Sequence, residues 1–246
     1  MLKTVKNALF LSIFLLTFSQ ANLIELKKSE YAQFENLELL KRNSITVEKA
    51  FNAGELYILK ISAQGAKDEI FVTKDKKYVI SGTVINSSNG TQLKSPVDLT
   101  PLKNKEAFIY GHGDKELILF TDPQCPYCKK FESYFEQIKD KVKIKVFFYP
   151  LDFHKEARDI SKYILSQKTT KEKIDAFFEF EIGDDLTKIK NMKYSKSQNE
   201  SLEKILDEHL KLGTNLGVQG TPALFDKDGN SIVWVKLLSD YNISVK

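Results

Sequence analysis

The most reactive side chains of this chain are two cysteines that are separated by two residues. They are Cys125 and Cys128, in the sequence Cys-Pro-Tyr-Cys, and the chain contains no other cysteine. A thiolate can act as a nucleophile, as a metal ligand or as one half of a disulfide, so a pair at this spacing is open to three kinds of chemistry. The elements that position the pair decide between them.

Three explanations other than redox exchange fit the pair less well. A zinc site takes about four ligands, and the chain adds only His112, His154 and His209, none of them at zinc-finger spacing. We expect these histidines to be surface or capping residues. A structural disulfide would close a very short loop. An exported protein, which the N-terminal residues described below indicate, is instead stabilised by disulfides between distant cysteines. A buried, permanently reduced pair is difficult to keep beside a turn in an oxidising compartment.

The residues around the pair predict a strand, a turn and a helix in succession. Leu117 to Thr121 is a short apolar run, and Asp122-Pro123 is typical of a turn. Pro126 suits the first position of a helix, where its missing N–H costs nothing. Apolar side chains then recur at helical spacing at Phe131, Tyr134, Phe135 and Ile138.

This arrangement favours thiol–disulfide exchange. The unpaired N–H groups and the dipole at the start of the helix would stabilise a Cys125 thiolate and lower its pKa. Cys128, nearly one turn later, would lie on the same side and further in, from where it could attack a mixed disulfide. A lowered pKa also makes Cys125 a good leaving group. We therefore predict that Cys125 is the accessible thiol and Cys128 the shielded one.

The remainder of the C-terminal half alternates between strands and helices. Further strands are predicted at Ala107 to Tyr110, Val142 to Tyr149, Ala223 to Phe225 and Ile232 to Val235. The last two flank Asp228-Gly229, a strong hairpin signal. Residues 155–212 have a largely helical pattern, with interruptions near 183–185 and 194–198. The last residues, Ser239 to Lys246, are predicted to form a short final helix at most.

The N-terminal half has a different periodicity, which predicts a small α+β unit. Ser29 to Arg42 has apolar residues at helical spacing, and strands are predicted at Leu56 to Ser62, Glu69 to Thr73 and Tyr78 to Ile85. So few strands are marginal alone, and burial against a partner would help them. We place the N-terminal domain at 22–95, a linker at 96–106 and the second domain at 107–246, with a helical insertion at about 155–212.

The first 21 residues have the pattern of a signal peptide. Lys3 and Lys6 precede the apolar run Ala8 to Phe18, and Ser19-Gln20-Ala21 supplies small residues at the cleavage positions. Eleven helical residues span about 16 Å, too short for a hydrocarbon core of about 30 Å. We therefore expect export to the periplasm, cleavage after about Ala21 and no stable membrane insertion.

Composition excludes one further class of protein and argues weakly against another. The 246 residues are 42% hydrophobic, enough for a sizeable core, so the chain is not intrinsically disordered. Basic residues number 37 against 33 acidic ones, and only Arg42 and Arg158 are arginines. Nucleic-acid sites favour the bidentate arginine fork, so this lysine-rich, nearly balanced mixture argues against a nucleic-acid partner.

Two segments of the chain resemble one known family. Leu117 to Phe131, LILFTDPQCPYCKKF, is similar to the active-site segment of the bacterial periplasmic disulfide isomerases of the DsbC/DsbG type. Leu216 to Phe225, LGVQGTPALF, is similar to that family's second catalytic segment, in which Thr221 and Pro222 match the cis-proline loop. Upstream, Ile70 to Thr91 resembles the N-terminal dimerisation domain.

The resemblance implies a fold, a mechanism and partners. The fold would be an α+β, cystatin-like dimerisation domain followed by an α/β thioredoxin-fold catalytic domain with a helical insertion, assembled as a V-shaped homodimer. Cys125 would attack and Cys128 resolve, Pro126 and Tyr127 would complete the motif, and the bond before Pro222 would be cis. No cofactor or metal is implied. The substrates would be misfolded exported proteins, and a membrane partner of the DsbD type would keep the pair reduced.

Two alternatives remain open. The protein could be a net disulfide oxidase of the DsbA type, because the direction of exchange depends on the redox partner. It could also be a non-catalytic chaperone that holds unfolded chains. The Pro-Tyr dipeptide is closer to DsbG than to the Gly-Tyr of DsbC, which puts the substrate range in doubt, and the second cysteine pair of DsbC is absent.

Overall fold

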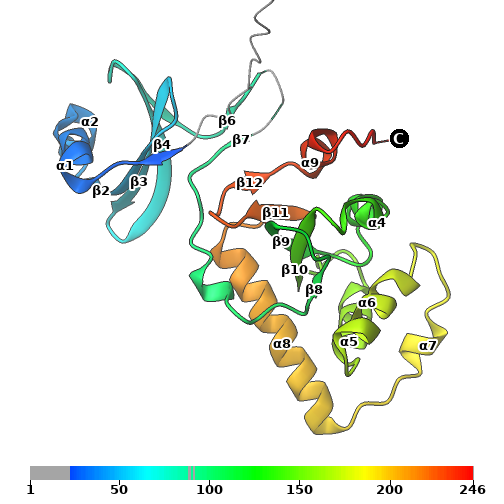
Figure 1. Ribbon diagram of the computed structural model, residues 1–246. Helices are drawn as coiled ribbons and strands as arrows, with labels where there is room; N and C mark the ends of the chain where they lie inside the picture. The colour runs from blue at the N-terminus through cyan, green and yellow to red at the C-terminus, as the bar shows by residue number, and fades with distance from the viewer. Residues whose placement is uncertain (1–22, 88–89, 91, 246) are drawn as a thin grey trace, which may run out of the picture. The chain divides into compact units, whose positions relative to one another are not determined.

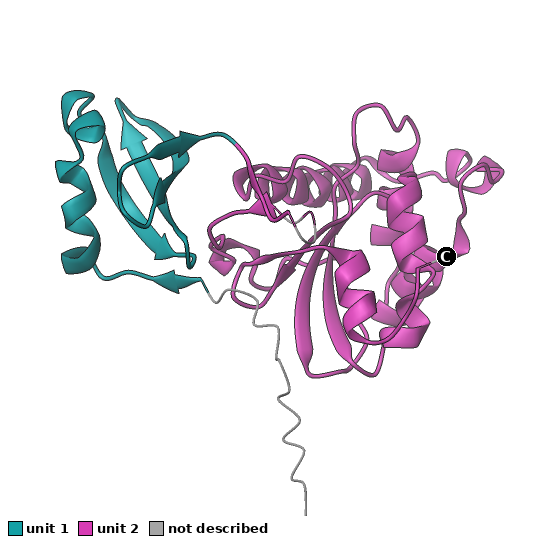
Figure 2. Cartoon of the chain, turned by 90° about the horizontal axis from the view of Figure 1, so that it is seen from above, with its two compact units in different colours: residues 1–82 teal, residues 83–246 magenta. Residues whose placement is uncertain are grey.

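A computed structural model describes residues 23–87, 90 and 92–245 (Figure 1). The predicted signal peptide and its cleavage site lie outside the described residues. The chain divides into two compact units, residues 1–82 and 83–246 (Figure 2), and each is treated by itself. The domain limits expected from the sequence stay predictions. Within the described ranges, no helix is at once long and apolar enough to cross a membrane.

The first unit contains a five-stranded antiparallel sheet in the order β1-β2-β3-β4-β5. Its strands are β1 (Ile24–Glu25), β2 (Thr46–Asn52), β3 (Leu56–Ala63), β4 (Ala66–Thr73) and β5 (Val79–Ser81). The sequence did not predict β2. Its register against β3 shifts between Val47 and Lys49, and this bulge interrupts the alternation of apolar and polar residues by which a strand is recognised.

Short helical segments cover one face of this sheet. The single helix expected over residues 29–42 is wrong, because the segment divides into α1 (Lys28–Tyr31), a 3-10 turn (Ala32–Asn36) and α2 (Glu38–Arg42). Leu37 is extended and separates the last two. Phe34 and Leu40 are fully buried, and they pack with a cluster of strand residues: Val47, Ala50, Leu59, Ile61, Ile70 and Val72.

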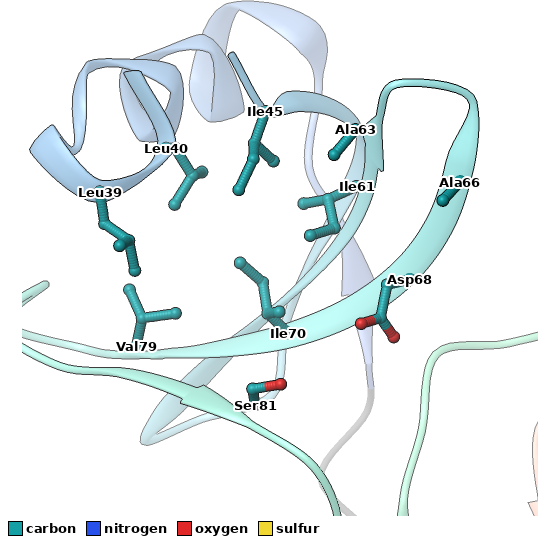
Figure 3. Close-up of a pocket in the computed structure, with 10 residues that line it drawn as sticks. All are labelled: Leu39, Leu40, Ile45, Ile61, Ala63, Ala66, Asp68, Ile70, Val79 and Ser81. Carbon is teal, nitrogen blue, oxygen red and sulfur yellow. The ribbon is translucent and has the colours of Figure 1, made fainter. Parts of the chain in front are cut away.

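An apolar cavity of about 370 Å³ opens at one end of this unit (Figure 3). Most of its lining side chains are aliphatic, and they come from α2, from the segment before β2 and from strands β3 to β5: Leu39, Leu40, Ile45, Ile61, Ala63, Ala66, Ile70 and Val79, with Asp68 and Ser81. Leu39 is more than half exposed at this cavity. The unit therefore leaves part of its own apolar layer uncovered.

The strand expected over residues 78–85 is divided in two. It bends at Gly82, whose φ of 114° lies in the region that favours glycine. β5 continues the first sheet, while β6 (Val84–Ile85) pairs with β7 (Gln92–Leu93) as a separate hairpin.

The second unit is built on a five-stranded sheet in the order β12-β11-β9-β10-β8. Its strands are β8 (Phe108–Tyr110), β9 (Lys115–Thr121), β10 (Val142–Phe148), β11 (Ala223–Asp226) and β12 (Ser231–Ile232). β9 and β10 are parallel, and the other pairs are antiparallel. Ala223 lies opposite Phe120, so the C-terminal end of β9 lies beside the N-terminal end of β11.

Helices cover both faces of this sheet (Figure 1). The helical segments of this unit are the 3-10 turn Thr100–Leu102, α3 (Pro126–Glu132), α4 (Phe135–Ile138), α5 (Ala157–Leu165), α6 (Thr170–Glu179), α7 (Thr187–Lys190), α8 (Lys196–Asn215) and α9 (Trp234–Asp240). In the central strand, Leu117 and Leu119 join one buried cluster, while Ile118 and Phe120 join the other. Burial on both faces explains why this strand is a continuous apolar run.

The helical insertion follows the sequence pattern, whereas the end of the chain does not. The interruption expected near 183–185 separates α6 from α7, and the one near 194–198 contains the start of α8, where Ser195 and Gln198 form a capping box. The strand expected at 232–235 is present but ends at Ile232 in β12, and the final helix, expected at 239–246, is α9, which begins at Trp234. The Trp234 ring lies 5.4 Å from that of Phe131, so packing overrides local β-propensity.

His209 is a core residue, and the expectation of a surface or capping role is wrong for it. Its side chain on α8 is 1% exposed. Nδ1 accepts a hydrogen bond from the N–H of Phe148 at 3.2 Å, and Nε2 donates to the carbonyl of Lys105 at 2.7 Å. Burial lowers the pKa of His209 to about 4. The imidazole therefore joins α8, β10 and the segment before β8 in its neutral form.

This burial predicts a loss of stability between about pH 6.5 and pH 4. In the unfolded chain the imidazole has a pKa of about 6.5 and is protonated in this window, whereas in the folded protein it stays neutral. The free energy of unfolding therefore falls as pH falls from about 6.5 to 4, by up to about 3 kcal/mol. Denaturant titrations of the wild type and of His209→Gln at several pH values should differ by this slope, because the other titrating groups are common to both proteins. The control is His112→Gln, an exposed histidine paired with Asp140. An unchanged slope in His209→Gln would contradict the assignment.

Candidate active site

The two cysteines lie at the start of α3, as the sequence predicts. β9 ends at Thr121, and a turn closed by the Cys125 N–H and the Asp122 carbonyl, 3.0 Å apart, brings the chain to the helix. Cys125 is the N-cap of α3 and Pro126 its first residue. Cys125 is 4% exposed and Cys128 is fully buried. Both cysteines are therefore buried, and only Cys125, which the sequence predicts to be the accessible thiol, keeps a small exposed fraction.

The predicted Thr221 and Pro222 lie beside this pair. Their peptide bond is cis, and they immediately precede β11. The Cys125 sulfur lies 3.3 Å from the Thr221 carbonyl oxygen, to which the thiol donates a hydrogen bond in its protonated form. The antiparallel pairing of β9 and β11 brings these residues together, although they are 96 positions apart in the sequence.

The surroundings of Cys125 favour its thiolate. Its pKa is lowered to about 5, chiefly by a hydrogen bond from the Cys128 thiol. The side chain of Thr221 and the backbone N–H groups of Cys128 and Tyr127 contribute further, against an opposing effect of burial. The N–H groups at the helix start act as the sequence analysis expects, but the partner thiol contributes most.

Cys128 has the opposite character. Burial raises the pKa of its thiol, and the hydrogen bond to Cys125 raises it further. The N–H of Asp122 lies 3.5 Å from the Cys128 sulfur. The pair therefore holds one proton on Cys128 and one negative charge on Cys125.

Asp122 fixes the turn that carries Cys125, a role that the sequence did not reveal. Its carboxylate is fully buried and accepts hydrogen bonds from the N–H of Gln124 and of Leu151, each at 2.7 Å. Nδ1 of His154 lies 2.8 Å from Oδ2 of the same carboxylate. His154, expected to be a surface or capping residue, thus ties the loop after β10 to the active-site turn.

Gln124 makes a second connection between the same two loops. Its side-chain oxygen accepts from the N–H of Glu156 at 2.8 Å, and its amide nitrogen donates to the Glu156 carboxylate at 3.0 Å. These contacts join segments about 30 residues apart in the chain. Two sets of hydrogen bonds, from Asp122 and from Gln124, thus hold the turn before α3, so that the position of Cys125 does not depend on the helix alone.

Two aromatic side chains near the motif are exposed. Tyr127, within the motif, is 69% exposed, and Phe153, next to His154, is 74% exposed. Large aromatic side chains that remain in water are suited to contacts with apolar segments of another polypeptide. The sequence pointed to Tyr127 through the motif, whereas Phe153 lies in a loop without a recognisable pattern.

A further polar group lies buried under the pair. Glu132 on α3 accepts a hydrogen bond from the Thr121 hydroxyl at 3.0 Å and lies 2.9 Å from the Lys129 ammonium group. The sequence analysis named Thr121 only as a strand end and did not consider Glu132. Glu132 follows Cys128 by four residues, so a charged residue on the same face of the helix as Cys128 and Phe131 was the available signal.

Metal binding has no preformed site in the described part of the chain. Within residues 23–87, 90 and 92–245, no cluster of three or more histidine, cysteine, aspartate or glutamate side chains is placed to hold an ion. His112 lies at the surface against Asp140, and His209 is engaged by backbone groups. Each of the three histidines therefore has partners other than the two cysteine sulfurs.

The comparisons with known proteins agree with this geometry. Residues 102–236, more than half of the chain, match the family model described as a thioredoxin-like domain. The chain belongs to the thioredoxin-like domain family. The matched residues contain the whole site, from the 3-10 turn before β8 to the first residues of α9.

Similar curated proteins are named as thiol:disulfide interchange proteins. The probable DsbC of Bordetella pertussis is 26% identical over 140 residues, which cover 56% of this chain and 44% of that protein. DsbC of Salmonella typhimurium is 26% identical over 168 residues, 65% of each. The chain thus spans less than two thirds of the length of these relatives. Among solved structures, the catalytic domain of Proteus mirabilis ScsC is 22% identical, covering 56% of this chain and 89% of that one, with a TM-score of 0.39.

The opposite pKa shifts predict selective alkylation of the reduced protein. At about pH 6, a thiol with a pKa near 5 is mostly thiolate, whereas Cys128 stays protonated and buried. Limiting iodoacetamide should therefore label Cys125 first, as read by mass spectrometry of peptides that separate the two sulfurs. Cys125→Ser should react far more slowly than Cys128→Ser under the same conditions. Preferential labelling of Cys128 would reverse the assignment.

Proposed function

We propose that this protein is an exported thiol–disulfide oxidoreductase that acts as a protein disulfide isomerase. The observation that carries the proposal is the contrast between the two thiols. Cys125, with its pKa lowered to about 5, lies over a protonated and buried Cys128. The shared family and the names of the similar proteins support the same chemistry.

The exchange reaction follows from the two protonation states. The Cys125 thiolate attacks one sulfur of a wrong disulfide, a new bond forms between Cys125 and that sulfur, and the other substrate sulfur leaves as a thiolate. The freed substrate thiolate can then attack another disulfide of the same substrate, which is isomerisation. Alternatively, Cys128 attacks Cys125, releases the substrate as a thiol and leaves the protein oxidised.

Features beside the sulfur support a polypeptide substrate. The Thr221 carbonyl is a backbone hydrogen-bond acceptor next to Cys125, and an extended chain could pair with this segment. The exposed rings of Tyr127 and Phe153 offer apolar contacts near the motif. Substrates of this proposal are misfolded exported proteins, and a membrane partner of the DsbD type would return the oxidised pair to its dithiol form.

Replacement of Cys125 tests the proposal. Cys125→Ser should fail to restore activity to a test protein with scrambled disulfides, because the attacking thiolate is gone. Cys128→Ser retains the attack and should accumulate a mixed disulfide, visible on a non-reducing gel. If Cys125→Ser reshuffles as well as the wild type, the proposed chemistry is wrong. If it loses reshuffling but still suppresses aggregation, a chaperone activity accompanies the enzyme.

We also propose that the first unit makes the protein a homodimer. β5, a strand of three residues, is at the edge of its sheet, and the apolar cavity of Figure 3 reaches it through Val79 and Ser81. An open edge beside uncovered apolar side chains suits pairing with a second copy. Two catalytic units in one particle would keep a substrate near a second thiolate while its disulfides rearrange.

A substitution at the mouth of the cavity separates dimerisation from chemistry. Leu39→Asp places a charge on this exposed apolar surface, so the mature protein should sediment as a monomer, still reduce a small disulfide and lose most of its reshuffling of a multi-disulfide substrate. The control is Ile24→Asp, at an equally exposed site on β1, the opposite edge strand. A monomeric wild type at micromolar concentration, or full reshuffling by a monomeric variant, would contradict the proposal.

A further inference from the structure

One tyrosine contacts both of the chain segments that meet at Cys125. Tyr149 directly follows β10, and its N–H donates a hydrogen bond of 2.7 Å to the carbonyl of Thr121, the last residue of β9. Its side chain extends to the other segment, where the phenol donates to the carbonyl of Val218 at 3.1 Å. Val218 lies three residues before Thr221. The main chain and the side chain of Tyr149 therefore join the strand before the active-site turn to the cis-proline loop.

The phenol of Tyr149 is the middle member of a short chain of hydrogen bonds. Its oxygen lies 3.1 Å from the hydroxyl of Thr214, in the last turn of α8. A phenol has one proton, and a carbonyl oxygen can only accept. The Tyr149 proton is therefore used for Val218, and Thr214 must donate to the phenol oxygen. The chain of donors runs from Thr214 through Tyr149 to the Val218 carbonyl and fixes the orientation of that carbonyl.

Gly213 provides the space that the tyrosine ring occupies. A Cβ atom at Gly213 would lie 2.6 Å from two carbons of the Tyr149 ring, which is far inside van der Waals contact. On another side, the ring packs edge-on against Phe120, with 6.1 Å between the ring centres. Glycine inside a helix is less stable than alanine. The close approach of Tyr149 to α8 therefore explains why the helix carries a glycine here.

The reactive form of the site needs this support for the cis-proline loop. The hydrogen bond from Cys125 to the Thr221 carbonyl uses the thiol proton, which a thiol with its pKa lowered to about 5 has lost at neutral pH. On the C-terminal side, the pairing of Ala223 with Phe120 holds the loop. On the N-terminal side, the two residues between Val218 and Thr221 make no backbone hydrogen bond to any described residue. The nearest support on that side is the contact of Val218 with Tyr149.

We propose that Tyr149 is a positioning residue that holds the Thr221 carbonyl in place for an extended substrate chain, an inference that rests on the proposed function. Once Cys125 is a thiolate, this carbonyl has no donor and is free to accept from a backbone N–H of the substrate. Tyr149 acts through Val218 and not on the sulfur atoms. Its loss should therefore weaken the recognition of a polypeptide more than the attack by Cys125.

Two substrates with the same leaving group separate recognition from attack. One is a single blocked cysteine joined by a disulfide to thionitrobenzoate, and the other is the same cysteine in the middle of a short, unstructured peptide. In both, the Cys125 thiolate attacks the cysteine sulfur, a bond forms between these two sulfurs, and thionitrobenzoate leaves with the electron pair as a coloured thiolate. The rate constants are measured by stopped flow with the reduced mature chain, and their ratio, peptide over single cysteine, is the peptide preference.

The expected result is a loss of peptide preference in variants of this chain of hydrogen bonds. Tyr149→Phe keeps the ring and removes only the phenol oxygen, so the preference should fall about tenfold, because the carbonyl of the buried Val218 loses its donor. Gly213→Ala retains the phenol but displaces the ring, and it should lower the preference as well. Thr214→Val should have a smaller effect in the same direction, and Thr214→Ser should keep the preference because it retains the donor.

The matched control is Tyr163→Phe, which removes another phenol, one that donates to the Glu179 carboxylate at 3.1 Å and links α5 to α6. This variant loses a hydrogen bond of the same kind and should keep the peptide preference, so a loss of stability alone is not the readout. A preference of wild-type size in Tyr149→Phe with native circular dichroism would overturn the inference.

Two further outcomes keep the inference and the proposed function apart. If Tyr149→Phe does not fold, an equal preference in Thr214→Val and Thr214→Ser would overturn the inference, and so would a wild type that reacts equally fast with both substrates. A reduced wild type that releases no thionitrobenzoate from either substrate would instead contradict the proposed function, because Cys125 would then not be the attacking thiolate.

Discussion

The active site depends on one hydrogen bond, from the thiol of Cys128 to the sulfur of Cys125. It requires one sulfur to keep its proton while the other loses it, and the fold arranges both conditions. α3 begins at Cys125, so unpaired N–H groups face that sulfur. The same helix buries Cys128 within its first turn, where the thiolate is unfavourable. Both shifts follow from the position of a single helix against β9.

The lowered pKa of Cys125 changes the rate at which this sulfur attacks less than it changes its quality as a leaving group. A shift from about 9 to about 5 raises the thiolate fraction at neutral pH about 100-fold, but lowers intrinsic nucleophilicity by about 40- to 100-fold at the usual Brønsted slope. The two effects nearly cancel for the attack. The remaining gain is in departure, because a stable thiolate leaves readily when Cys128 or a substrate thiol displaces it. A site of this kind is built for repeated exchange.

Sequence reasoning reached the features that are local or carried by a motif. The strand, turn and helix around Cys125 follow from about 20 contiguous residues, and Thr221 and Pro222 came from the resemblance. The contacts of Asp122 with His154 and of Thr121 with Glu132 join separate elements, and no periodicity encodes which polar groups meet across them. The sequence did not predict β2, because a bulge interrupts its alternating pattern. It did not predict the start of α9, because Trp234 has a high β-propensity but packs on α3 as part of a helix.

Two consecutive residues at the end of β9 divide the work around the pair. Thr121 is the last residue of β9 and Asp122 the first residue after it, and their side chains have different partners. The Asp122 carboxylate holds the loop after β10, while its N–H contacts Cys128. The Thr121 hydroxyl donates to the Glu132 carboxylate on α3. One residue therefore fixes the turn that carries Cys125, and the other joins the end of β9 to the helix that buries Cys128.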